Sequence, residues 1–178
     1  MPDTQWPRFM VFQQSGEAEP LLHNGTVHAP DVEMALLNAR DVFARRPEAV
    51  SMWVVPADAI YTQTREELAA GLPADPATGQ PADYYVFAKF SEQTQCSYVG
   101  EVRAGSPQAA MRAAIEKFRG QDPLWWWVFP ASVVVRSDAG EAGPMFAPAR
   151  AKTFKDQAEY PVVTMMRQLR SKGKLDKK

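Results

Sequence analysis

"SMWVVPADAI" (51–60) and "WWWVFPASVV" (125–134) share a Trp-Val pair and a Pro-Ala pair at the same places. Upstream of both stretches, a constant shift superimposes further identities without a gap: Val11-Phe12 on Val86-Phe87, Gly25 on Gly100, Val27 on Val102, Ala29 on Ala104, Ala35 on Ala110, Ala39 on Ala114 and Phe43 on Phe118. Agreement at a nearly constant shift indicates an internal repeat. We therefore interpret residues 5–62 and 82–137 as two copies of one unit.

Each copy has the same predicted order of elements. Two runs around a shared glycine predict a β-hairpin, and a third apolar run closes the copy. Between them a stripe at helical spacing predicts a helix, with Asp31 as N-cap in the first copy and Ser106 followed by Pro107 in the second. We therefore predict an α+β fold of two tandem β-β-α-β units. Each would be a small mixed sheet with one helix on one face, as in ubiquitin-like β-grasp proteins.

The remaining segments differ in character from the repeats. Residues 63–81 are rich in Pro and Gly and are interpreted as a linker, and residues 138–178 as a C-terminal arm with a short helix and a basic tail. Within each unit the third strand is apolar on both faces, and one helix can cover only one of them. The other face must meet the second copy or another protein. We predict that the two sheets face each other or lie side by side, with a pseudo-twofold, so that one chain replaces a homodimer.

Composition narrows the class of protein. The chain has 178 residues, a formal net charge of −1 and a single cysteine, Cys96. Residues 150–178 carry nine Lys or Arg against three Asp or Glu, so the basic charge lies away from the aromatic-rich body. We therefore expect no nucleic-acid partner. No leader-like or membrane-spanning apolar run is present, and the lone cysteine suits a reducing setting, so we expect a cytoplasmic protein without membrane contact.

The inventory of reactive groups is small. His23 and His28 both lie in the first hairpin, at an odd separation that points them to opposite faces of a strand. Cys96 aligns with Leu21, as expected of a packed thiol. No phosphate-binding glycine loop, nucleophile elbow, Cys-x-x-Cys pair or helical Glu-x-x-His motif is present. We therefore predict no catalytic, cofactor-binding or metal-binding residues on this chain.

The residues of the first copy also carry a family resemblance. Trp6-Pro7, "HNGTVHA" (23–29), "MALLNARD" (34–41), Arg45-Arg46 and "SMWVV" (51–55) closely resemble PaaB, the small B subunit of bacterial phenylacetyl-CoA epoxidases. Downstream, "MFAPARAKTFKDQAEY" (145–160) is similar to the C-terminal segment of that family. The familiar subunit is a single unit with this arm. Here a second, diverged unit precedes the arm.

The resemblance implies a bridging role without catalysis. In the family complex, a ferritin-like A subunit holds the diiron site and the CoA-thioester substrate and pairs with a structural C subunit, while a reductase supplies electrons from NADPH. The B subunit joins the A and C pairs. Two alternatives stay open from the sequence. One is a stand-alone module that binds a protein, or an apolar ligand on an open sheet face. The other is a self-sufficient enzyme, which the missing acid, base and metal groups disfavour.

The expected partner interface follows from these comparisons. The first copy keeps the family-like polar surface, so we place the family-type contact there; the alternative is a set of surface ion pairs of little energy. Trp127 aligns with Trp53 and is assigned to the repeated core, whereas Trp126 points the opposite way and is assigned to an interface with the first copy or an oxygenase subunit. The predicted interface residues are Arg40, Asp41, Arg45, Arg46, Trp126, Phe146, Lys152, Phe154 and Tyr160.

Overall fold

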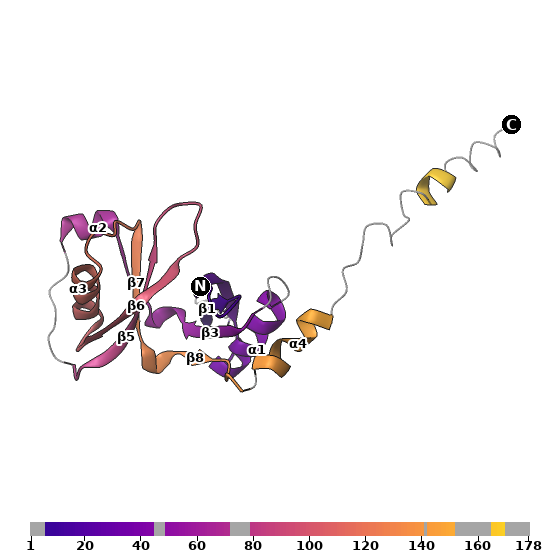
Figure 1. The fold of residues 1–178 in the computed structure, drawn as a ribbon, viewed down its shortest axis with the longest axis horizontal. Coiled ribbons are helices and arrows are strands. Elements are labelled where there is room, and N and C mark those ends of the chain that lie inside the picture. Colours follow the sequence, from indigo (N-terminus) through magenta and orange to yellow (C-terminus); the bar gives the residue numbers. More distant parts are fainter. Residues whose placement is uncertain (1–5, 45–48, 72–78, 141, 152–164, 170–178) are drawn as a thin grey trace.

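The computed structural model describes residues 6–44, 49–71, 79–140, 142–151 and 165–169 (Figure 1). The elements of the first repeat are β1 (Arg8–Gln14), β2 (Leu22–His28), α1 (Val32–Phe43), β3 (Ser51–Pro56), the 3-10 turn η1 (Ala57–Ala59) and β4 (Tyr61–Thr64). After α2 (Arg65–Ala70), the second repeat contains β5 (Ala82–Lys89), β6 (Ser97–Ala104), α3 (Pro107–Lys117), β7 (Trp125–Pro130), η2 (Ala131–Val133) and β8 (Val135–Arg136). The element that follows is α4 (Ala142–Ala151).

Local sequence explains where the helices begin. Asp31 Oδ1 accepts a 2.7 Å hydrogen bond from the backbone N–H of Met34, and Ser106 Oγ accepts one of 3.0 Å from that of Ala109. Both predicted caps are confirmed. The segment expected to be a linker begins instead with α2. There Thr64 and Glu67 form a reciprocal capping box, which the sequence "TREE" contains.

The strands of the described chain form one sheet of eight, in the order β4-β7-β5-β6-β2-β1-β3-β8. In each repeat the first strand lies between the second and the third, and every strand pair in the described part of the chain is antiparallel. The predicted mixed sheet is therefore wrong, although the α+β class is confirmed. The reason is that the helix carries the chain across the first strand, so the second and third strands are never neighbours. The ubiquitin-like arrangement is not confirmed.

The two repeats exchange their last strands. β4 of the first repeat pairs with β7 of the second, with Tyr61 opposite Val128. β8 of the second repeat pairs with β3 of the first, with Val135 opposite Val54. The repeat alignment places Tyr61 on Val135 and Val54 on Val128, so the exchange is reciprocal. Each repeat supplies an outer strand to the sheet of the other.

A pseudo-twofold axis relates the repeats. Where β2 meets β6, Leu22 lies opposite Ser97, which holds the same position in the second repeat. The flanking bonds are also equivalent: the N–H of His23 donates to the carbonyl of Cys96 (2.8 Å), and the N–H of Tyr98 donates to that of Leu21 (2.9 Å). The axis thus passes between these strands. The expected pseudo-twofold is present, and the replacement of a homodimer by one chain stays a prediction.

The core has three parts. One cluster lies between α1 and the sheet of the first repeat, and a second lies between α3 and the sheet of the second. The third contains residues of both repeats, among them Phe12, Val55, Phe87 and Phe129. The two halves of the sheet therefore cover each other with the faces that point away from α1 and α3. The third strand of each repeat is apolar on both faces because one face meets its own helix and the other meets the second copy.

Trp126 and Trp127, the second and third of the three tryptophans of β7, lie on the opposite sides from those predicted. Trp126 is only 3% exposed and packs under α3, where its ring stacks on Phe118 with centroids 6.3 Å apart. Trp127 belongs to the cluster between the repeats, edge-on to His23 at 4.9 Å. The prediction that Trp126 and Trp127 point to opposite faces is confirmed. The prediction of which face lies under the helix is wrong. Trp126 is therefore a core residue and is not available to a partner subunit.

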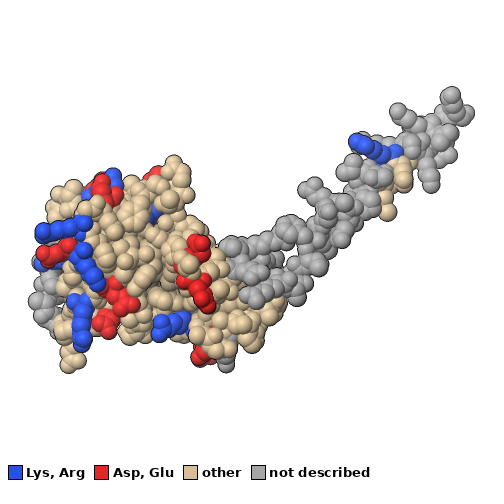
Figure 2. Space-filling view, viewed as in Figure 1, with Lys and Arg blue, Asp and Glu red and all other residues tan. Residues whose placement is uncertain are grey.

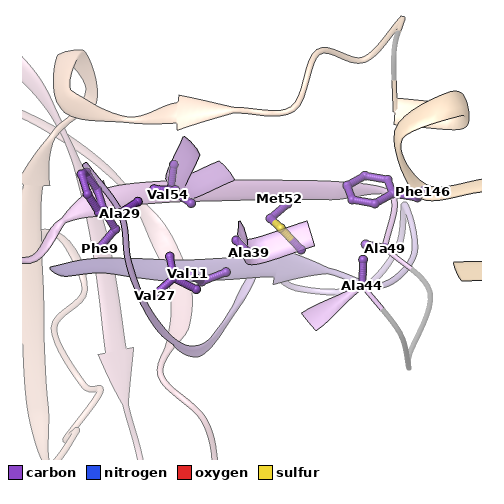
Figure 3. Packing of buried hydrophobic residues seen from close by; sticks show 11 residues of the cluster. Phe9, Val11, Val27, Ala29, Ala39, Ala44, Ala49, Met52, Val54 and Phe146 are labelled. Carbon is purple, nitrogen blue, oxygen red and sulfur yellow. The ribbon is translucent and has the colours of Figure 1, made fainter. Parts of the chain in front are cut away.

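Phe146 is also a core residue. It projects from α4 into the cluster beneath α1 and is 3% exposed, with Ala44 and Ala49 close to its ring (Figure 3). The prediction that it contacts another subunit is therefore wrong, because its ring fastens α4 to the first repeat. α4 accordingly lies against the first repeat, although it follows the second in the chain (Figure 1).

Candidate functional site

The predicted interface residues that remain exposed lie on α1. Arg40 Nη2 and Asp41 Oδ1 form an ion pair of 3.0 Å with each other on the helix surface. An exposed pair of this kind contributes little to folding. Five other predicted residues lie outside the described part of the chain: Arg45, Arg46, Lys152, Phe154 and Tyr160.

The outer faces of α1 and α3 differ in chemistry. On α1, Met34 and Leu37 are each 42% exposed and Val42 is 56% exposed. The residues at the same places on α3 are Ala109, Arg112 and Lys117. Lysine, arginine and acidic side chains intermingle on the side of the molecule where α2 and α3 lie (Figure 2). At two of these three positions the first repeat thus presents an apolar group where the second presents a positive charge.

Two grooves at equivalent positions of the two repeats also differ in the charge of their lining residues. Each lies between the second strand and the helix of its repeat, at positions that correspond in the repeat alignment. The groove of the first repeat is lined by Thr26, Val27, His28, Asn38, Asp41 and Val42. That of the second is lined by Asp83, Glu101, Val102, Arg103, Ala113, Glu116 and Lys117. Divergence has therefore changed the charge of this surface, while the groove keeps its place between the second strand and the helix.

A larger groove, of about 770 Å³, lies where the two repeats meet. We call it the junction groove. Its lining comes from both repeats and comprises Gln14, Glu19, Pro20, Leu21, Val50, Ser51, Trp53, Tyr85, Tyr98, Glu101, Arg136, Ser137, Asp138 and Ala139. Strand exchange brings these residues together, because Arg136 ends β8, which pairs with β3, and Asp138 follows it. Its volume is within the range of ligand-binding clefts.

Three half-buried aromatic rings line the junction groove. The centroids of Trp53 and Tyr85 are 4.8 Å apart, and Tyr98 lies 6.1 Å from Tyr85 and 6.4 Å from Trp53. The guanidinium carbon of Arg136 lies 6.0 Å from the centre of the Trp53 ring. The groove therefore already places one cation against its aromatic wall.

Carboxylates add negative charge to the junction groove. Its charged lining residues are Glu19, Glu101 and Asp138 on the acidic side, and Arg136 on the basic side. The hydroxyl of Tyr98 donates a 3.1 Å hydrogen bond to Glu101 Oε1. Burial, together with this bond to a carboxylate, raises the pKa of Tyr98 to about 12. The phenol therefore stays neutral and fixes one carboxylate at the wall.

The positions equivalent to the junction groove, at the opposite end of the molecule, carry different residues. Ser51 is replaced there by Trp125, whose ring lies 4.6 Å from the Lys89 ammonium. The three groove carboxylates are all replaced by threonine: Glu19 by Thr94, Glu101 by Thr26 and Asp138 by Thr64. The sequence predictions missed the groove. A residue-by-residue comparison of the repeats contains the signal, namely a serine opposite a tryptophan and three acids opposite threonines.

The buried reactive groups do not form a site. Burial raises the pKa of Cys96 to about 12, so its thiol is protonated at neutral pH. Among the described residues, no three His, Cys, Asp or Glu side chains lie close enough together to hold a metal ion. Across the same residues, no helix is long and apolar enough to cross a membrane.

Comparison with known proteins assigns the family. The family model of PaaB, phenylacetic acid degradation B, matches residues 5–78 and 80–167. The chain belongs to the PaaB family. Because the match spans both repeats, the second unit of this PaaB chain is covered by the family pattern as well as the first.

A relative with a named function supports the assignment. The PaaB chain is 42% identical over 67 residues to the B subunit of 1,2-phenylacetyl-CoA epoxidase from Escherichia coli strain K12. The matched residues make up 38% of this PaaB chain and 70% of the relative. One unit of the tandem PaaB chain is thus comparable in extent to most of that relative. No solved structure matches the chain.

Proposed function

We propose that this protein is a bridging subunit, without catalysis of its own, in a multicomponent diiron oxygenase of the phenylacetyl-CoA epoxidase type. The observation that carries the proposal is the PaaB family match over both repeats. The relative from Escherichia coli is named as one subunit of 1,2-phenylacetyl-CoA epoxidase, which implies work within a complex. The function would be in the aerobic breakdown of phenylacetate or a related aromatic acyl-CoA.

The partners in this proposal are a ferritin-like A subunit, which would hold the two irons, and a structural C subunit. A reductase would act on the A subunit and contact this chain only indirectly. The described residues do not fit a diiron centre on this chain, because no cluster of carboxylates and histidines is available among them. In this proposal the chain supports the assembly of the complex, and the A subunit carries out the oxidation.

The outer face of α1 is the proposed contact with the oxygenase. It combines Met34, Leu37 and Val42 with the Arg40–Asp41 pair, and apolar groups exposed beside charged ones are typical of protein interfaces. The contact residues expected from the family resemblance also include Arg45, Arg46, Lys152, Phe154 and Tyr160, which lie outside the described part of the chain. The α3 face, with Arg112 and Lys117 at the corresponding positions, lacks this apolar character.

The alternative of an apolar ligand on an open sheet face is not favoured by the fold. In each half of the sheet, the face that points away from the helix is covered by the other repeat, through the cluster that includes Phe12 and Phe87. The outer faces are covered by α1 and α3. The sheet surface that such a ligand would need is therefore occupied by protein.

Co-expression with A and C subunits of an epoxidase tests the proposal. The three chains should elute together from a sizing column, and Leu37→Arg should weaken the complex because it puts the arginine of α3 on α1. Gln108→Arg is the matched control, since it adds the same charge to α3. Separate elution of the wild-type chain from the A and C pair would contradict the proposal.

A further inference from the structure

We propose that the junction groove is a binding site for a cationic segment of a partner polypeptide, with a lysine or arginine side chain held against Trp53, Tyr85 and Tyr98. This proposal rests on the proposed function in one respect only, namely that the partner is an oxygenase subunit. The chemistry of the site is argued from the groove itself.

The aromatic wall favours a cation. The face of an aromatic ring attracts ammonium and guanidinium groups, and Arg136 already uses the Trp53 ring in this way. Trp53, Tyr85 and Tyr98 pack against one another, which holds their rings in place before a ligand arrives. A site whose side chains are already ordered loses less conformational entropy on binding.

The charge of the lining points to the same class of ligand. Three carboxylates oppose one guanidinium around the groove, so an anionic group would meet net repulsion and a cationic one net attraction. Glu101 is additionally oriented by the hydroxyl of Tyr98. A lysine or arginine in the groove would therefore find a carboxylate beside an aromatic face, which is a combination that favours both of these side chains.

The other repeat shows that the fold does not require these groups. At the equivalent end the same backbone carries Thr94, Thr26 and Thr64 in place of the carboxylates. It also carries Trp125 in place of Ser51. An open, acidic groove at one end, and a tryptophan with a lysine and three threonines at the other, are both compatible with folding. Folding thus does not require the acidic lining or the small Ser51 of the junction groove. Binding of a ligand is the role that would explain them.

A defined peptide tests the site without any oxygenase subunit. The probe is a fluorescein-labelled peptide of four Arg-Gly repeats, titrated with the full chain and followed by anisotropy. Ser51→Trp fills the groove without changing charge and uses the residue that the other repeat tolerates. We expect it to raise the Kd of the probe roughly tenfold, the scale of one lost cation–aromatic contact. The double variant Glu101→Thr, Asp138→Thr should do the same and should also reduce the dependence of binding on salt.

Matched controls separate the groove from general electrostatics. Thr94→Glu adds a carboxylate at the equivalent of Glu19 on the other end, and should leave the Kd of the probe within about twofold. All variants must keep the urea midpoint of the wild type, so that a loss of binding is not a loss of folding. Absence of probe binding by the wild-type chain, or equal binding by Ser51→Trp, would overturn the inference.

The chain's own basic tail is the competing occupant. Residues 170–178 contain four lysines after Arg170. A full-length variant with Lys172, Lys174, Lys177 and Lys178 changed to glutamine should bind the probe as the wild type does. Binding several-fold tighter in that variant would show that the tail occupies the groove, and would overturn the assignment to a partner.

The same variants then distinguish the two proposals. If the A and C pair binds the wild-type chain but also binds Ser51→Trp equally well, the junction groove is not the site and the bridging function stands. If the peptide binds through the groove while the A and C pair does not bind at all, the groove inference stands and the bridging function fails.

Discussion

The rings of Phe12 and Phe87 lie with their centroids 4.4 Å apart, and the two residues hold the same position in the two repeats. A contact between equivalent residues places them at the pseudo-twofold axis. Both are fully buried, in the cluster that the repeats share. The centre of the molecule is thus made of one aromatic residue from each copy, and neither half has a closed core without the other.

Phe87→Ala should therefore lower the free energy of unfolding of the whole chain by about 3–5 kcal/mol, the usual cost of truncating a buried phenylalanine. Urea unfolding should show one transition, with far-ultraviolet and near-ultraviolet circular dichroism changing together. Phe90→Ala, at a position that is 42% exposed, is the control and should change stability by less than about 1 kcal/mol. Two separate transitions in the wild type would contradict the shared core.

Gly100→Ala should destabilise the second repeat for two reasons. Gly100 has a φ of +156°, which side-chain-bearing residues rarely adopt, and a Cβ built there would lie 2.7 Å from Cζ of Phe118. We expect a loss of about 1–3 kcal/mol, measured by urea unfolding. Gly143→Ala in α4 is the control, because a Cβ there meets nothing within 4 Å and alanine favours a helix. A neutral Gly100→Ala would show that the Phe118 ring moves aside freely.

The stability of the protein should fall below about pH 6.5 partly because of His23. Burial lowers its pKa, a nearby Lys89 adds to this, and a hydrogen bond with Gly25 opposes it. The folded state then binds a proton less readily than the unfolded chain, so the contribution of His23 is complete above the unfolded pKa and is lost as the pH falls through the folded pKa. His23→Tyr, which introduces the residue of the equivalent position 98, should flatten this part of the pH profile. Urea midpoints at pH 7.5 and 5.5 measure the effect, and an unchanged slope in the variant would contradict it.

Cutting the chain between the repeats should not separate them. A protease site placed within residues 72–78 would yield two fragments that remain joined through the β4–β7 and β8–β3 pairs and the shared core. The fragments should elute together from a sizing column at neutral pH and separate only in concentrated urea. Independent elution under native conditions would contradict the reciprocal strand exchange.

Much of the fold was predictable because its signals are local. The caps Asp31 and Ser106, the alternation along β3 and β7 and the repeat itself all lie within short stretches of sequence. The strand exchange was not predictable, because residues 61–64 have the same pattern whether they pair within their own repeat or with the other. The face assignment of Trp126 failed for a related reason: both faces of β7 end up covered by apolar groups, so alternation does not tell which group covers which face.

The junction groove depends on the same tertiary event. Arg136 and Asp138 are far from Trp53 in sequence, and only the pairing of β8 with β3 brings them to it. The replacement of Ser51 by Trp125 was visible in the repeat comparison, but its meaning requires knowing that both positions border a junction. The residues outside the described chain, among them Arg45 and Tyr160, keep their predicted roles as predictions.

The reciprocal exchange of β4 and β8 also has an evolutionary consequence. In a protein that pairs with an identical copy, each new mutation is inherited on both sides of the axis, so a change that helps one end must be tolerated at the other. Once both halves are encoded in one gene, selection acts on each end separately. Because both halves belong to one covalent chain, a mutation that weakens the β4–β7 or β8–β3 contact does not make the protein dissociate on dilution. Such a chain can therefore change the surface of one end for a new partner while the other end stays as it is.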